Sequence, residues 1–82
     1  MFLYILKSRK DNSYYIGITK DLENRILKHN KGKVLYTKPK RPWILVYKKQ
    51  YTTRSEALRE EKHLKSLKSR KAIEKIIQAA FV

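Results

Sequence analysis

The apolar stretch Phe2-Leu3-Tyr4-Ile5-Leu6, followed after a short polar segment by Tyr14-Tyr15-Ile16-Gly17-Ile18, decides the fold. The first run is continuously apolar, which predicts a strand buried on both faces. The second run is rich in aromatic and β-branched residues, which also favour strands. Between them, Asp11-Asn12-Ser13 has the composition of a turn. The two runs therefore predict an antiparallel hairpin at the start of the chain.

A helix is expected after the hairpin, from about Asp21 to Lys31. Thr19 or Asp21 can serve as its N-cap, since a short polar side chain there can accept a hydrogen bond from the first turn. Gly32 is expected to stop it, because glycine readily adopts the left-handed conformation that ends helices.

The second half of the chain predicts one strand and two helices. Trp43 to Tyr47 has the composition of a third strand, and Thr53-Arg54-Ser55-Glu56 has the spacing of a capping box that opens a helix to about Lys68. Ser69 can cap a last helix. Its apolar positions recur at helical spacing: Ile73, Ile76, Ile77, Ala80 and Phe81. The order β-β-α-β-α-α predicts one α+β domain over residues 1–82, a three-stranded antiparallel sheet with packed helices.

Charge indicates the class of partner. The chain carries 21 Lys and Arg against 7 Asp and Glu, a net charge of +14. Polyanions would offset the self-repulsion of such a surface, so binding to nucleic acid is the favoured explanation of the charge. A charged surface that only keeps the protein soluble is the second explanation, and binding to an anionic membrane is the third. The chain has no cysteine, which excludes disulfides, thiolate metal sites and cysteine nucleophiles. With no signal peptide or membrane span either, we expect a cytoplasmic monomer without a membrane partner.

Two short motifs on the expected hairpin, Phe2-Leu3-Tyr4 and Tyr15-Ile16-Gly17, resemble the signature of the GIY-YIG nucleases. The first appears as Phe2-Leu3-Tyr4, which departs from the family at two positions but keeps its tyrosine, and the second is an intact Tyr15-Ile16-Gly17. On the following helix, Arg25 and His29 occupy the positions where the family carries an essential arginine and a His or Tyr. Glu61, in the run EALREEKHLK, matches the metal-binding glutamate of the second long helix.

The resemblance covers nearly the whole chain. It is similar to the small stand-alone members, and through them to the N-terminal incision domain of the bacterial excision-repair nuclease. It implies hydrolysis of phosphodiester bonds in DNA with one divalent cation, Mg²⁺ or Mn²⁺, held by Glu61. Arg25 would neutralise charge on the phosphoryl group. Tyr4 or Tyr15, with His29, would position or deprotonate the water; the sequence does not choose between them. Many members carry a late asparagine that contacts the site; none follows Asn30 here, and Lys65 or Lys71 is a candidate substitute.

Each motif residue also has a structural interpretation. Arg25 and His29 share one helix face, where an arginine can simply be solvated and a histidine can be a satisfied core residue. Gly17 can mark a bulge or a close backbone approach, either by the fold or by substrate. Glu61 falls on the core-facing arc of its helix, where a buried carboxylate needs a partner such as a metal, Arg25 or a lysine. Glu60 lies near the same arc, so the helical wheel alone does not select Glu61.

Basic residues interleaved with an aromatic predict a nucleic-acid contact in the polar segment from Lys31 to Arg41. Such a pattern suits a phosphate backbone with an exposed base to stack, although a charged loop with a packing tyrosine has the same composition. A second basic cluster surrounds the end of the helix that carries Glu61. It is expected to form the floor of the same nucleic-acid-binding groove. The candidate binding residues are Lys33, Tyr36, Lys38, Lys40, Arg41, Lys65 and Lys68.

The function that this reading favours is a metal-dependent DNA endonuclease, selective for substrate structure and linked to DNA repair or processing. RNA is left open as a substrate. The alternatives are a nucleic-acid-binding module that keeps the fold without cleaving, and a protein-interaction subunit of a repair complex.

Overall fold

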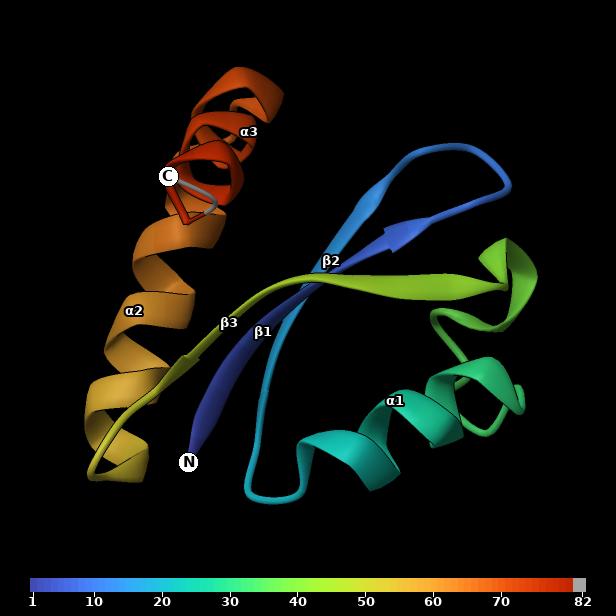
Figure 1. Ribbon diagram of the computed structural model, residues 1–82, viewed down its shortest axis with the longest axis horizontal. Coiled ribbons are helices and arrows are strands. Elements are labelled where there is room, and N and C mark those ends of the chain that lie inside the picture. The colour runs from blue at the N-terminus through green and yellow to red at the C-terminus, as the bar shows by residue number, and fades with distance from the viewer. Residues whose placement is uncertain (81–82) are drawn as a thin grey trace.

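Strand β1 (Phe2–Ser8) lies at the centre of a three-stranded antiparallel sheet, between β2 (Tyr14–Thr19) and β3 (Trp43–Gln50). This arrangement is seen in the computed structural model, which describes residues 1–80 (Figure 1). Strand β3 runs three residues beyond the predicted end at Tyr47. It does so because Lys48, Lys49 and Gln50 still pair with the first residues of β1.

The hairpin between β1 and β2 forms for the predicted reason. The Asp11 carboxylate accepts hydrogen bonds from the Ser13 backbone N–H at 3.0 Å and from its hydroxyl at 2.6 Å. Asn12 takes a left-handed conformation with φ of 64°, which asparagine tolerates better than most residues. The resulting register places Tyr4 directly opposite Gly17 and Leu6 opposite Tyr15.

The helices are α1 (Leu22–Asn30), α2 (Arg54–Ser66) and α3 (Arg70–Ala79), with a short 3₁₀ turn, η1 (Lys38–Lys40), in the polar segment. Asp21, rather than Thr19, caps α1, and Gly32 follows with φ of 76°. The capping box of Thr53 and Glu56 is present, and Ser69 caps α3. The predicted α+β order β-β-α-β-α-α is confirmed.

Two boundaries near the C-terminus differ from the prediction. Helix α2 ends at Ser66 instead of Lys68, because Lys68 adopts φ of 48°, a conformation that cannot continue a right-handed helix. Ala80, predicted on the apolar face of the last helix, is exposed just past its end. Phe81, assigned to the same face, lies outside the described residues.

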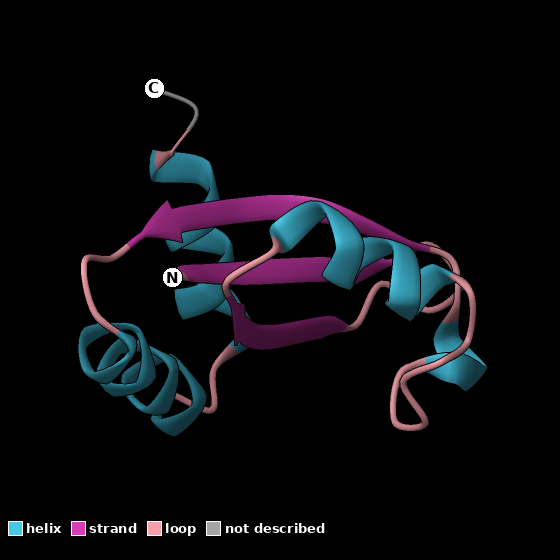
Figure 2. Ribbon diagram, turned by 90° about the horizontal axis from the view of Figure 1, so that it is seen from below, coloured by secondary structure: helices cyan, strands magenta, loops and turns pink. Residues whose placement is uncertain are grey.

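Helices cover both faces of the sheet, as Figure 2 shows. On one face, Leu3 and Ile5 of β1 pack with Ile16, Leu64 and Ile73 beneath α2 and α3. On the other, Tyr4 and Leu6 pack with Trp43 beneath α1. Leu3 through Leu6 are all fully buried, so the prediction that this strand is buried on both faces is confirmed. The alternation puts both motif tyrosines on the α1 side, apart from the main aliphatic core.

None of the helices within residues 1–80 has the length and apolar character needed to cross a membrane.

Candidate active site

Tyr4 and Tyr15 lie side by side on neighbouring strands, with ring centroids 6.3 Å apart. They share the α1 face of the sheet because Tyr4 pairs with Gly17 and Tyr15 lies two residues before Gly17. Tyr4 is completely buried, whereas Tyr15 is only partly buried and reaches the surface. The two tyrosines that the sequence treated as equivalent are therefore in different environments.

Helix α1 brings Arg25 and His29 onto Tyr4. The Arg25 Nε–H donates a hydrogen bond to Tyr4 Oη at 3.4 Å, and Tyr4 Oη lies 3.0 Å from His29 Nε2. The His29 ring also packs edge-on against Tyr15, with centroids 4.9 Å apart. His29 is fully buried. The predicted constellation of two tyrosines, an arginine and a histidine is thus brought together on one side of the sheet.

Glu61 lies on α2, close enough to this cluster for its charge to act on Tyr4. Its side chain is 18% exposed, and its Oε2 pairs with Lys65 Nζ at 3.3 Å. Burial is the main cause that raises the pKa of Tyr4, and the negative charge of Glu61 adds to it. The negative charge of Glu60 acts instead on Tyr47 and Tyr51, where it adds to the effect of burial in raising the pKa of each tyrosine. The charge of Glu61, and not that of Glu60, therefore acts on the motif tyrosine Tyr4.

An open groove runs beside Tyr15 on the surface. It has a volume of about 430 Å³ and is lined by Tyr14, Tyr15, Ile16, Tyr36 and Lys65. Tyr36 is 77% exposed, and its ring centroid lies 6.0 Å from that of Tyr15. We call this feature the tyrosine groove. It joins the partly buried motif tyrosine to an exposed aromatic ring and to the lysine that pairs with Glu61.

The GIY-YIG catalytic domain model matches residues 1–75 of this sequence. The chain belongs to the GIY-YIG family. This membership places it in the nuclease superfamily, as its two hairpin motifs predicted. The matched residues include both motif tyrosines, Arg25, His29 and Glu61.

Several relatives are small proteins of similar length. A UPF0213 protein of Staphylococcus saprophyticus is 45% identical over 76 residues, which is 92% of each chain. One from Staphylococcus epidermidis is 50% identical over 66 residues, or 79% of each chain. The solution NMR structure of the UPF0213 protein BH0048 from Bacillus halodurans is 37% identical. It superposes with a TM-score of 0.62 over 95% of this chain and 82% of that one.

The cluster formed by Tyr4, Tyr15, Arg25 and His29 holds His29 as a neutral imidazole. Burial, and after it the nearby positive charge of Arg25, lowers the pKa of His29 from its ordinary value of 6.5 to about 4. The hydrogen bond to Tyr4 raises the pKa of Arg25, so the guanidinium stays charged. At neutral pH the site thus presents a fixed cation supported by a neutral phenol and a neutral imidazole.

The depressed pKa of His29 predicts a loss of stability in acid. The unfolded chain binds a proton at this histidine below pH 6.5, while the folded chain resists protonation until about pH 4. Stability from this group is complete above pH 6.5 and falls by up to about 3 kcal/mol as the pH drops to 4. Urea unfolding at a series of pH values measures it. His29→Gln should lack this component, and an equally steep loss in that variant would contradict the assignment.

Gly17 makes room for Tyr4. A Cβ atom placed on Gly17 would lie 2.6 Å from Tyr4 Oη and 2.7 Å from its Cζ. The space above this glycine is therefore filled by the side chain on the facing strand. The close approach that the sequence predicted at Gly17 is therefore made within the fold, by the side chain of Tyr4.

Gly17→Ala is expected to displace the Tyr4 hydroxyl, because the completely buried ring has little free space to move into. The hydrogen bonds to His29 and Arg25 would lengthen, and overpacking would cost about 1–3 kcal/mol of folding free energy. Thermal melting and the ring NMR signals of Tyr4 measure both effects. Gly32→Ala, also strained but just past the C-terminal end of α1 and against Arg41, is the control and should leave the Tyr4 signals in place. Unchanged Tyr4 signals in Gly17→Ala would contradict this role.

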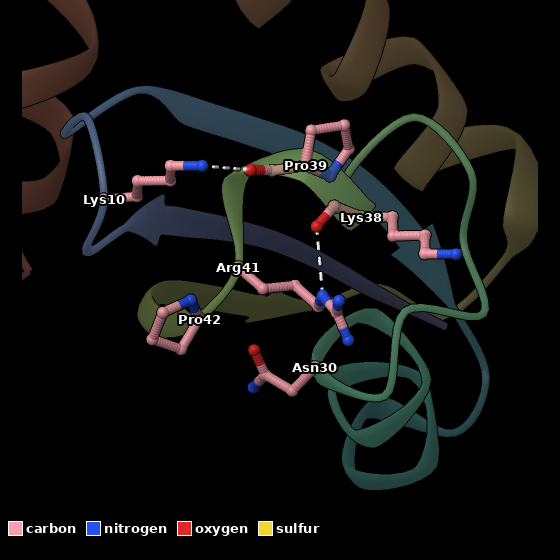
Figure 3. Close-up of a pocket in the computed structure, with 6 residues that line it drawn as sticks. All are labelled: Lys10, Asn30, Lys38, Pro39, Arg41 and Pro42. Carbon is pink, nitrogen blue, oxygen red and sulfur yellow. Dashed lines mark hydrogen bonds between the residues drawn. The ribbon is translucent and has the colours of Figure 1, made fainter.

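The basic residues of the polar segment divide between different surfaces. Lys38 and Arg41 line an open hollow of about 500 Å³ with Lys10, Asn30, Pro39 and Pro42, as Figure 3 shows. The Arg41 Nε–H donates to the Lys38 carbonyl at 3.0 Å, and Lys10 Nζ donates to the Pro39 carbonyl at 3.2 Å. Lys40 pairs with Asp11 at 3.5 Å, and Lys33 is exposed.

The basic cluster at the end of α2 is also dispersed. Lys65 lines the tyrosine groove, while Lys68 is exposed in the turn to α3. Lys62 lines a separate hollow on α2 with Arg54 and Arg59. The expectation of one continuous floor is therefore not met, because Lys62 and Lys65 line separate hollows and Lys68 lies beyond the end of α2.

Three residues that support the site were not singled out from the sequence. Thr37 is fully buried, and its Oγ1 lies 2.7 Å from His29 Nδ1. The Trp43 indole N–H donates to the Thr37 carbonyl at 2.9 Å. Asn30 brackets the backbone of Trp43, accepting from its N–H at 2.6 Å and donating to its carbonyl at 3.0 Å. The proline-rich polar composition around Thr37 gave no signal that one of its residues is buried.

Proposed function

We propose that this GIY-YIG protein is a divalent-metal-dependent endonuclease that hydrolyses phosphodiester bonds in DNA. The observation that carries the proposal is the anchoring of the Arg25 guanidinium by Tyr4, which packs near Tyr15 of the tyrosine groove. The partly buried Glu61 carboxylate pairs with Lys65 of the same groove. A fixed cation and a hard carboxylate ligand beside an open aromatic surface are the parts that phosphoryl chemistry needs.

Arg25 is assigned to stabilise negative charge on the phosphoryl group. Its Nε is occupied by the hydrogen bond to Tyr4, which fixes the plane of the guanidinium. The two terminal nitrogens lie in that plane and can donate paired hydrogen bonds to two phosphate oxygens, the geometry that arginine favours. A preorganised cation of this kind lowers the barrier because it need not reorganise as charge develops.

Glu61 is assigned as the protein ligand of one Mg²⁺ or Mn²⁺ ion. Within residues 1–80 there is no group of three or more His, Cys, Asp or Glu side chains placed to hold a metal. A single carboxylate still fits Mg²⁺, which keeps several waters and takes further oxygens from substrate phosphates. Lys65, the ion-pair partner of Glu61, is 55% exposed and is free to swing aside. When bound, the cation would polarise the phosphate and neutralise the leaving oxygen.

Tyr15 is assigned to contact the attacking water or the scissile phosphate. Tyr4 is sealed from solvent, whereas Tyr15 opens onto the tyrosine groove. This difference supports Tyr15 for direct contact and Tyr4 for holding Arg25 in place. His29 then acts behind Tyr4, as the acceptor of its hydroxyl.

Substrate binding is assigned to phosphate contacts and to stacking. Tyr36 and Lys65 offer an aromatic face and a cation along the tyrosine groove, and Lys38 and Arg41 add positive charge on the hollow of Figure 3. Lys33, Lys40 and Lys68 supply exposed charge around them. Phosphate contacts carry no sequence information, so we expect the protein to select its substrate by structure. We assign this activity to DNA repair or processing within the cytoplasm.

The test is a cleavage assay on labelled branched, flapped, nicked, single-stranded and plain duplex DNA, with matched RNA, in Mg²⁺, Mn²⁺ or EDTA. The proposal expects cleavage of at least one DNA structure with either ion and none with EDTA. Binding to DNA without cleavage under all conditions would instead identify a binding module. Absence of binding would favour a protein-interaction role.

A further inference from the structure

The hydrogen bonds behind Arg25 form one continuous buried chain. It runs from Arg25 Nε to Tyr4 Oη at 3.4 Å, to His29 Nε2 at 3.0 Å, to Thr37 Oγ1 at 2.7 Å and finally to the Val34 carbonyl at 3.3 Å. Tyr4, His29 and Thr37 are all fully buried. The hydroxyls of Tyr4 and Thr37 and the ring nitrogens of His29 therefore depend on their neighbours in the chain rather than on water.

The two ends of the chain favour one direction for the protons in it. Arg25 can only donate, so Tyr4 Oη accepts there and its own proton is available to His29 Nε2. The Val34 carbonyl can only accept, so a Thr37 hydroxyl that donates to it accepts from His29 Nδ1. Both ends therefore favour the same tautomer of His29, with the proton on Nδ1 and a bare Nε2.

Thr37 is itself held rigidly. Its backbone N–H donates to the Val34 carbonyl at 3.2 Å, and its carbonyl accepts the Trp43 indole N–H at 2.9 Å. The hydroxyl is therefore presented to His29 by a locked loop segment. This is unlike a hydroxyl that rotates freely at the surface.

We propose that Thr37 is a positioning residue of the active site, which fixes the Nδ1–H tautomer of His29 and, through Tyr4, the orientation of the Arg25 guanidinium. This inference rests on the proposed function for its link to cleavage. With the other tautomer, His29 Nε2–H would donate to Tyr4 Oη, and the Tyr4 proton would have to turn toward Arg25. Arg25 would then lose its acceptor and its fixed plane.

The first readout does not depend on activity. A long-range ¹H–¹⁵N correlation spectrum of the labelled protein at pH 7 shows which ring nitrogen of His29 carries the proton. Wild type and Thr37→Ser, which keeps the hydroxyl, should show Nδ1–H. Thr37→Val, which has a similar shape without the hydroxyl, should show Nε2–H or a mixture of tautomers. An Nε2–H tautomer in the wild type would overturn the proposal.

The second readout is single-turnover cleavage in Mg²⁺. Thr37→Val should be slower by about 100-fold, as expected when a catalytic group is misplaced, and Thr37→Ser should stay near the wild-type rate. A wild-type rate in Thr37→Val would overturn the proposal, as would a slow rate with the tautomer unchanged. If Thr37→Val does not fold, the wild-type tautomer and the Thr37→Ser rate still decide. If the wild-type protein shows the Nδ1–H tautomer but cleaves no substrate, that result would reject the proposed function and leave the tautomer assignment standing.

Discussion

Arg25→Ala is expected to lower the single-turnover rate of DNA cleavage by about 100- to 1,000-fold, the loss typical of removing one preorganised donor to developing charge. The effect on binding should be much smaller, because the charge that Arg25 opposes grows mainly in the transition state. Arg25→Lys should recover little of the rate. A lysine lacks the planar fork that bonds Tyr4 with one nitrogen while presenting two others to phosphate.

Lys38→Ala is the matched comparison for Arg25→Ala. Lys38 lines the basic hollow away from the tyrosine groove, so its loss should weaken binding and reduce the salt dependence of affinity. The rate of the bound complex should remain close to that of the wild type. If Arg25→Ala behaves in the same way as Lys38→Ala, then Arg25 is a binding residue and its assigned catalytic role fails.

Glu61→Gln is expected to abolish measurable metal-dependent cleavage with almost no loss of stability. Glutamine keeps the shape of the side chain but removes the negative charge that a hard cation requires. The ion pair that is lost joins Glu61 to Lys65 one helical turn away, and Lys65 is 55% exposed. Such a pair contributes about 0.3–0.5 kcal/mol, so the melting temperature should change little. Affinity for DNA in EDTA should hold or rise slightly.

Glu60→Gln is the control for Glu61→Gln, since the two carboxylates are neighbours on α2 but face different tyrosines. It should cleave normally. Loss of cleavage in Glu60→Gln alone would move the metal ligand by one residue. A large drop in melting temperature for Glu61→Gln would instead assign Glu61 a structural role.

The parts of the fold that the sequence predicted are those governed by local interactions. The capping box at Thr53, the cap at Ser69 and the turn at Asp11 each depend on residues within three positions of one another. The end of β3 was wrong because it depends on pairing with the distant start of β1. The exposed residues Lys48 and Lys49 carry no apolar signal that would extend the strand.

The residues of the candidate site also divide into those that local sequence patterns predicted and those that they did not. The sequence placed Arg25 and His29 on one helix face and both tyrosines on adjacent strands, and the structure brings the four together. It could not separate Tyr4 from Tyr15, because their exposure depends on how the groove is built from α2 and the polar segment. It also missed Thr37, whose burial depends on its contacts with His29 and Trp43 rather than on its neighbours along the chain.

Single-turnover cleavage by the wild-type protein across a range of Mg²⁺ concentrations tests the central claim most directly. Protein in excess over a labelled DNA substrate keeps the substrate bound, so the measured rate reports chemistry alone. We predict a rate that rises and saturates with Mg²⁺, vanishes in EDTA and is absent at every Mg²⁺ concentration in Glu61→Gln. A rate that is independent of Mg²⁺, or a Glu61→Gln variant that cleaves as fast as the wild type, would contradict the central claim.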